Sequence, residues 1–287
     1  MSRAGRRWLA VLCILLTGAA LGSCAAPARG TLPAGARPVL FVHGYGEAPG
    51  VFDAMIEHLA GRDYPRDLLL AVELDPNDGS NVGAAEGPIA EGVTLLLDRA
   101  SVDRAADEGN GTVDIVAHSM GAASSRWYVT RLHPERVRSL TTVVGANHGT
   151  DALCGYPGAG ALEMCPAFDR NPDNPVQAGL NGVAAAPVDE TPYGRGRDPV
   201  AVTPVPPEAG RSIRYTTVAL PEDAWIQPVA SAALAGADEL PGLPDGVAAQ
   251  PTPGNLVFTG PTDHDAILSD EAVMQLLDNV LTAAGTR

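Results

Sequence analysis

The residues Val113-Asp114-Ile115-Val116-Ala117-His118-Ser119-Met120-Gly121 give the clearest indication of the fold. A β-branched run ends abruptly at Ser119, and the residues two places before and after this serine, Ala117 and Gly121, are small. A run compatible with a helix, residues 122–132, follows at once. The pattern predicts a buried strand, a turn too tight for bulky neighbours and a helix, with Ser119 on the turn.

Ser119 has two interpretations at this point. The five residues from Ala117 to Gly121 match the G-x-S-x-G pattern of a nucleophilic serine except at the first position, where alanine is still small enough for the turn. A serine that only caps the following helix is the simpler interpretation. A nucleophile would also need a base, an acid that orients the base and an oxyanion hole, all from elsewhere in the chain.

The composition limits the kind of protein this can be. The chain has 287 residues, 45% of them apolar, which is enough for one large domain with a full core. Its net charge is −15, and every basic residue is an arginine. A chain this acidic lacks the basic surface that nucleic-acid binding requires, so no nucleic-acid partner is expected. The acidity is typical of a protein kept in solution outside the cell.

The N-terminus has the pattern of an export signal. Basic residues within 3–7 precede an apolar run at 8–16, which predicts a signal peptide over residues 1–23 that is too short to span a membrane. Leu21-Gly22-Ser23-Cys24 looks like a bacterial lipobox, with Cys24 as the lipidated residue. Ordinary cleavage nearby is the alternative. We expect an exported protein that is secreted, or attached to the membrane only through a lipid on Cys24. Residues 24–37 form a linker.

Alternating strand and helix patterns fill the rest of the chain. Five further apolar runs have the character of buried strands, at residues 38–43, 68–74, 140–144, 213–220 and 256–259. Apolar residues at helical spacing occur within 52–59, 89–97 and 273–281. This alternation predicts an α/β fold with a mostly parallel sheet and helices on both faces, as one domain over 38–287. Functional sites in such sheets lie beyond the carboxyl ends of the strands.

Residues 147–211 interrupt this alternation with a proline-rich segment of little periodicity. A segment of this length inside a compact domain is usually a functional loop, so a cap or lid over the site is expected here. Cys154 and Cys165 lie within it. In an exported protein such a pair most often forms a disulfide, which would pin the cap.

One of the six histidines must be the base if Ser119 is a nucleophile. In hydrolases with such a turn the order along the chain is serine, acid, histidine, which selects His264 in the loop after the last predicted strand. A loop histidine with purely structural bonds is the alternative. Other roles are expected for the remaining five, which are His43, His58, His118, His133 and His148. The side chain of His118 should point away from the site, because this residue immediately precedes Ser119.

The acid that orients the base is expected in the loop after residues 213–220. Asp223 is the first choice and Glu222 its rival, because either carboxylate could orient an imidazole. Both could instead be solvated charges on a loop.

The oxyanion hole needs two backbone N–H donors. Met120, directly after the serine, would supply one of them. The loop His43-Gly44-Tyr45-Gly46 follows the first strand, and Tyr45 would supply the other. The alternative for this loop is a glycine-rich turn that binds nothing.

Taken together, these motifs resemble those of the bacterial class 2 lipases, which are secreted serine hydrolases of the α/β-hydrolase fold. The resemblance extends over residues 38–284 and includes several stretches in the same order: 41–46, 113–121, 147–150, 215–217, Asp223, 227–228, 231–237 and His264. Two departures are the lack of a further downstream cysteine pair and the proline-rich expansion at 191–210. The resemblance implies hydrolysis of acyl esters without a cofactor or metal ion.

The apolar side chains of the cap segment predict a role in substrate binding. Met164, Phe168 and Leu180 are expected to line a trough for an acyl chain, because ligand sites are mostly apolar. A small satellite core pinned by the disulfide is the alternative for the same side chains.

The sequence therefore predicts an extracytoplasmic carboxylic-ester hydrolase, a lipase or esterase, with Ser119, His264 and Asp223 as its triad and an acyl-enzyme intermediate. Its partner is an ester or lipid substrate, and a monomer is expected. A depolymerase of extracellular polyesters with the same triad is one alternative. A catalytically silent hydrolase fold that serves as a binding module at the cell surface is the other.

Overall fold

The computed structural model describes residue 32 and residues 35–101, 111–186, 188–194, 213–240, 242–251 and 254–283. The predicted signal peptide, Cys24, most of the linker and residues 187 and 195–211 of the predicted cap lie outside the described residues. None of the helices in the described part combines the length and apolar character that crossing a membrane requires.

A seven-stranded sheet forms the centre of the molecule, with strand order β2-β1-β3-β4-β5-β7-β6. All neighbours pair in parallel except β6 and β7, which are antiparallel. The strands are β1 (Val39–Val42), β2 (Leu69–Val72), β3 (Val113–His118), β4 (Val137–Val143), β5 (Arg214–Ala219), β6 (Val247–Ala249) and β7 (Asn255–Phe258). All six predicted strands are present, which confirms the mostly parallel sheet.

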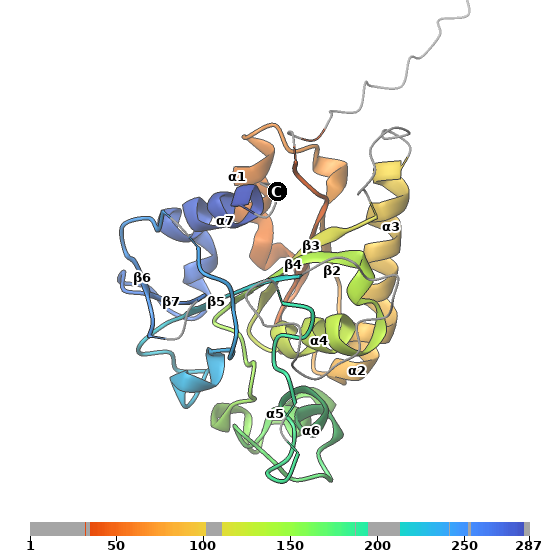
Figure 1. Ribbon diagram of the computed structural model, residues 1–287, viewed down its shortest axis with the longest axis vertical. Helices are drawn as coiled ribbons and strands as arrows, with labels where there is room; N and C mark the ends of the chain where they lie inside the picture. Colours follow the sequence, from red (N-terminus) through yellow and green to blue (C-terminus); the bar gives the residue numbers. More distant parts are fainter. Residues whose placement is uncertain are drawn as a thin grey trace, which may run out of the picture.

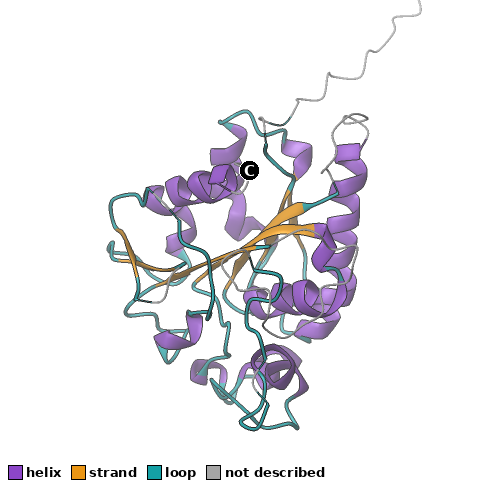
Figure 2. Cartoon of the chain, in the orientation of Figure 1, coloured by secondary structure: helices purple, strands orange, loops and turns teal. Residues whose placement is uncertain are grey.

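Two groups of helices cover the two faces of this sheet (Figures 1 and 2). The helices are α1 (Asp53–Ala60), α2 (Asn81–Ala84), α3 (Ala90–Ser101), α4 (Gly121–Trp127), α5 (Ala159–Met164), α6 (Pro175–Asn181) and α7 (Glu271–Ala283). In β1, Val39 and Phe41 pack in the core on the side of α1 and α7, whereas Leu40 and Val42 pack on the side of α3 and α4. This alternation follows from the period of two in a strand.

Single helical turns complete the regular structure. They lie at Pro49–Phe52, Arg66–Leu68, Ala85–Ile89, Tyr128–Leu132, Pro134–Arg136, Asp151–Leu153, Val229–Ala232 and Ala266–Ser269. The predicted helix at 122–132 is therefore α4 followed by a π-helical turn. β6 was not predicted because only one of its three residues is buried, which leaves too short a pattern.

The described part of the predicted cap forms a small lobe. α5 and α6 lie together beside α4, at one end of the molecule (Figure 1). Cys154 and Cys165 form the predicted disulfide, with their Cα atoms 5.1 Å apart. The lobe buries Met164, Val176 and Leu180, which belong to the continuous core that also includes Met120.

Arg126 attaches this lobe to the helix that follows Ser119. Its side chain is fully buried, and burial lowers its pKa to about 10. The guanidinium donates to the carbonyl of Asn147, to Oδ1 of Asn181 at 2.9 Å and to the carbonyl of Leu180 at 2.9 Å. A buried charge needs such acceptors, so the lobe and α4 are held in one fixed arrangement.

Candidate active site

Ser119 lies on the turn between β3 and α4 with a φ of 52°, in the left-handed region that residues other than glycine rarely adopt. Neighbouring backbone fixes this conformation. Its N–H donates to the carbonyl of Val143 at 3.3 Å, and its carbonyl accepts from Ala122 at 3.1 Å and Ala146 at 3.0 Å. The turn therefore presents the serine side chain at the carboxyl edge of the sheet, as the sequence predicted.

Glycines let the first strand and its loop approach this turn. A Cβ on Gly121 would lie 2.5 Å from the carbonyl oxygen of Val42 and 2.4 Å from that of His43. A Cβ on Gly44 would lie 2.6 Å from the Cβ of Ser119. All three distances are shorter than atoms tolerate, so the glycines at these positions are required by packing between β1 with its loop and the turn.

His264 and Asp223 form a hydrogen-bonded pair beside the serine. Nδ1 of His264 lies 2.8 Å from Oδ2 and 3.0 Å from Oδ1 of Asp223. Asp223 is 1% exposed and also accepts from the N–H groups of Trp225 at 2.7 Å and Ile226 at 2.9 Å. Burial opposes its ionisation, but the bond and charge of His264 and the two N–H groups outweigh burial and lower the pKa of Asp223. An ionised Asp223 makes Nδ1 the donor, which leaves Nε2 available as a base.

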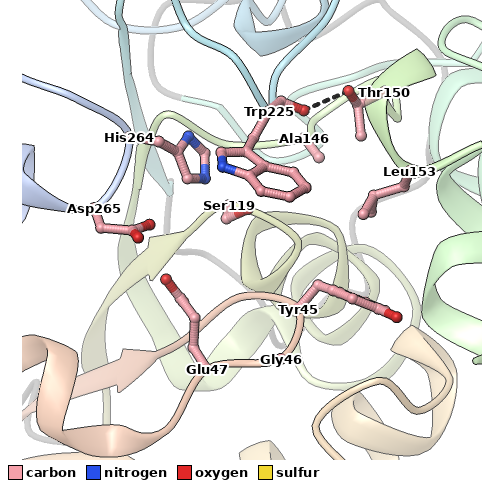
Figure 3. Close-up of a pocket in the computed structure, with 10 residues that line it drawn as sticks. All are labelled: Tyr45, Gly46, Glu47, Ser119, Ala146, Thr150, Leu153, Trp225, His264 and Asp265. Carbon is pink, nitrogen blue, oxygen red and sulfur yellow. Dashed lines mark hydrogen bonds between the residues drawn. The ribbon is translucent and has the colours of Figure 1, made fainter. Parts of the chain in front are cut away.

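A cavity of about 220 Å³ opens over these residues. Figure 3 shows Ser119 at its centre, with the imidazole of His264 and the indole of Trp225 next to it. The carboxylates of Glu47 and Asp265 lie on one side, and Tyr45 and Leu153 on the other. The lining residues are Tyr45, Gly46, Glu47, Ser119, Ala146, Thr150, Leu153, Trp225, His264 and Asp265.

The two N–H groups assigned to the oxyanion hole have no partner among the described residues. Neither the N–H of Tyr45 nor that of Met120 donates a hydrogen bond there, whereas Gly44 donates to Glu47 and Gly46 donates to the carbonyl of Asn77 at 2.9 Å. Tyr45 lines the cavity and Met120 directly follows Ser119. Both N–H groups are therefore free to bind a negatively charged oxygen at this position.

Three residues expected to bind substrate are not among those that line this cavity. Met164 and Leu180 are 1% and 2% exposed and lie in the core of the lobe. Phe168 stacks on the ring of His148 at 4.9 Å, beside a separate hollow. The expectation fails because the lobe must bury its own apolar faces, which is the satellite-core alternative. Among the described residues of 147–211, Thr150 and Leu153 alone line the cavity.

Sequence reasoning missed Glu47 and misplaced His118. The side chain of His118 was expected to point away from the site, but its ring lies 4.7 Å from the ring of His264 and is completely buried. It lies 3.0 Å from Glu47 and 2.9 Å from the carbonyl of His264. The position of His118 directly before Ser119 was the only signal in the sequence, because nothing marked Glu47 as its partner.

His118, His264 and Asp265 have ligand atoms within 4.8 Å of one another, which is close enough to consider a metal ion. Both ring nitrogens of His118 already have partners, and Nδ1 of His264 is held by Asp223. The cluster could therefore offer only Nε2 of His264 and the Asp265 carboxylate, fewer ligands than protein metal sites usually have.

Comparisons with known proteins identify the fold. No family model matches the chain. The crystal structure of the mature lipase BlEst2 from Bacillus licheniformis superposes with a TM-score of 0.55 at 13% identity, over 89% of this chain and 93% of that one. The chain therefore has the α/β-hydrolase fold, which at this identity is all that the likeness establishes.

Two other solved structures are similar at lower scores. One, titled for the metagenome-derived lipolytic enzymes LipS and LipT, has a TM-score of 0.46 and 14% identity over 90% of this chain and 98% of that one. A pyrethroid hydrolase from Sphingobium faniae has a TM-score of 0.41 and 16% identity, over 86% and 98%. Both scores are too low to support a closer comparison.

The packing of Gly121 against β1 gives a prediction for stability. Gly121→Ala should lower the free energy of unfolding by about 1–3 kcal/mol, because its Cβ meets backbone atoms that cannot move aside. Gly87→Ala is the matched control, since a Cβ there would meet nothing within 4 Å. Urea denaturation of the two variants measures the difference. Equal stabilities would show that the small residue is not required by packing.

Proposed function

We propose that this protein is a serine hydrolase of carboxylic esters, similar in type to the bacterial class 2 lipases. One observation carries the proposal: the strained Ser119 lines one cavity together with His264, whose ring is hydrogen-bonded to the buried Asp223 from a third loop. Their order along the chain is serine, acid, histidine, which is the order in hydrolases of this fold.

In the proposed reaction, Oγ of Ser119 attacks the ester carbonyl while Nε2 of His264 accepts its proton. His264 then gives this proton to the departing alcohol, and Asp223 orients the imidazole and stabilises its charged form. The N–H groups of Tyr45 and Met120 bind the negative oxygen of the tetrahedral intermediate. Water repeats the sequence on the acyl-enzyme and releases the acid.

The cavity favours an esterase for small substrates over a lipase for long chains. Its volume of about 220 Å³ is below the range of about 300–1,000 Å³ common for ligand pockets. Its apolar side is formed by Ala146, Leu153 and Trp225, and part of Tyr45. We propose that this side holds a short acyl group, while the alcohol leaves next to His264, which must protonate it.

We further propose that the enzyme acts outside the cytoplasm. The export pattern of residues 1–23 supports this location, as does the disulfide between Cys154 and Cys165, since such bonds persist in oxidising compartments. A lipid on Cys24 would keep the enzyme at the outer face of the membrane, and palmitate labelling of the full chain, compared with Cys24→Ser, tests this.

The triad assignment predicts large losses of activity with the fold intact. Ser119→Ala and His264→Ala should each lower kcat/KM for p-nitrophenyl butyrate by about 10³–10⁶-fold, and the double variant should be little worse, because triad members act as a unit. Asp223→Asn should lower kcat by about 10⁴-fold, because the amide favours the wrong tautomer of His264. Circular dichroism checks the fold of each variant.

Glu222→Gln is the control for Asp223→Asn, since Glu222 is the adjacent carboxylate, is exposed and does not line the cavity. It should keep wild-type activity. Near wild-type turnover by Ser119→Ala or His264→Ala would refute the proposal. A larger loss from Glu222→Gln than from Asp223→Asn would move the acid to position 222.

The size of the cavity predicts the acyl preference. Across a series of p-nitrophenyl esters, kcat/KM should be highest between acetate and hexanoate and fall steeply towards laurate, because a longer chain cannot be buried. Leu153→Ala should extend the tolerated length, since Leu153 closes the apolar side. Leu162→Ala, at a 73% exposed position on α5 that does not line the cavity, should leave the profile unchanged. A preference for laurate in the wild type would contradict this view.

A further inference from the structure

Glu47 and His118 connect the three loops that meet at Ser119. Glu47 lies in the loop after β1, His118 is the last residue of β3, and His264 lies in the loop after β7. Nδ1 of His118 is 3.0 Å from Oε2 of Glu47, and Nε2 is 2.9 Å from the carbonyl oxygen of His264. Oε2 of Glu47 also accepts the N–H of Gly44. A continuous chain of hydrogen bonds thus runs from the oxyanion loop to the loop of the base.

The partners of His118 determine its protonation. A backbone carbonyl only accepts hydrogen bonds, so Nε2 must donate to His264. Oε2 of Glu47 already accepts from Gly44, and an ionised carboxylate also only accepts, so Nδ1 must donate as well. With a proton on both nitrogens, His118 is an imidazolium and forms a buried ion pair with Glu47.

The electrostatic surroundings agree with this assignment. Burial opposes the charge on His118, but the bond and charge of Glu47, the carbonyl of His264 and the charge of Asp265 outweigh it and raise the pKa of His118. Burial likewise opposes ionisation of Glu47, but the bond and charge of His118, with the N–H of Gly44 and the charge of His264, lower its pKa. Glu47, Asp265 and His264 are the titratable groups that face His118, and they come from both neighbouring loops.

We propose that the Glu47–His118 ion pair is a positioning device of the esterase, which holds the oxyanion loop and the backbone of the base in place around Ser119. The inference rests on the proposed function. Glu47 fixes the N–H of Gly44 and so orients the adjacent N–H of Tyr45 towards the cavity. His118 fixes the backbone of His264, while Asp223 fixes its ring. Neither Glu47 nor His118 takes part in proton transfer.

The ion pair should be visible in the pH dependence of activity. Because the pKa of His118 is raised, the pair persists to higher pH than it would with an ordinary imidazole and is lost as the pH rises through the raised value. The neutral imidazole has one N–H and must give up one of its two donated bonds. Ester hydrolysis should therefore decline reversibly as the pH rises through that value, and the decline should begin at lower pH in Glu47→Gln, which removes the charge of the partner.

The test compares Glu47→Gln and His118→Gln with the wild type, using p-nitrophenyl butyrate. Glu47→Gln should lower kcat by about 10–100-fold, because small displacements of catalytic groups are costly, while KM changes little. Glu47→Asp, which keeps the charge, should recover part of the loss. Glu135→Gln is the matched control. The Glu135 carboxylate lies 2.9 Å from Nδ1 of His133 in an exposed pair, and neither residue lines the cavity. This variant should leave kcat and the pH profile unchanged.

Nitrogen NMR of histidine-labelled protein measures the protonation directly and does not depend on activity. The signals of His118 are those of the wild type that are missing from the spectrum of His118→Gln. At neutral pH these wild-type signals should show that both ring nitrogens are protonated. A singly protonated His118 in the wild type would overturn the inference, as would wild-type kcat and pH profile in Glu47→Gln. If the wild type hydrolyses no ester, the proposed function fails, whereas the NMR result still decides whether the ion pair exists.

Discussion

The left-handed backbone of Ser119 is the constraint on which the rest of the site depends. A residue with a side chain adopts this conformation only when its surroundings enforce it. Here the enforcement comes from β4 through Val143, from α4 through Ala122 and from the loop after β4 through Ala146. The conformation of Ser119 is therefore set by hydrogen bonds from the neighbouring strand, helix and loop, and so by the order of the strands in the sheet. A change that separates β3 from β4 should alter the backbone conformation of Ser119 before it alters the packing of the core.

The buried charged groups near the serine have polar partners. Asp223 is held by His264 and two backbone N–H groups, Glu47 faces His118, and Arg126 donates to acceptors of the lobe. Burying one such group without its partner would cost several kcal/mol. These contacts join loops that are far apart in the sequence. The interactions that stabilise the buried charges therefore also fix the loops relative to one another.

The sequence carried enough information to predict the sheet and the meeting of Ser119, Asp223 and His264, because chain order and strand ends place them at one edge. Other parts depended on tertiary packing. Met164 and Leu180 are apolar, and no local pattern distinguishes a residue that lines a cavity from one that fills a lobe. The pairing of Glu47 with His118 joins positions 71 residues apart; Glu47 belongs to no motif, and His118 stands at a variable position of the serine motif. Long-range polar contacts of this kind cannot be read from periodicity or spacing.

The central claim is that Ser119 is a nucleophile activated by His264 and Asp223. Treatment of the folded protein with a fluorophosphonate probe, followed by mass mapping of the modified peptide, tests it most directly. If Ser119 is activated in this way, the wild type should carry one adduct per chain, on Ser119. Asp223→Asn and His264→Ala should be labelled much more slowly than the wild type. Absence of labelling in the native protein, or an adduct on any residue other than Ser119, would contradict it.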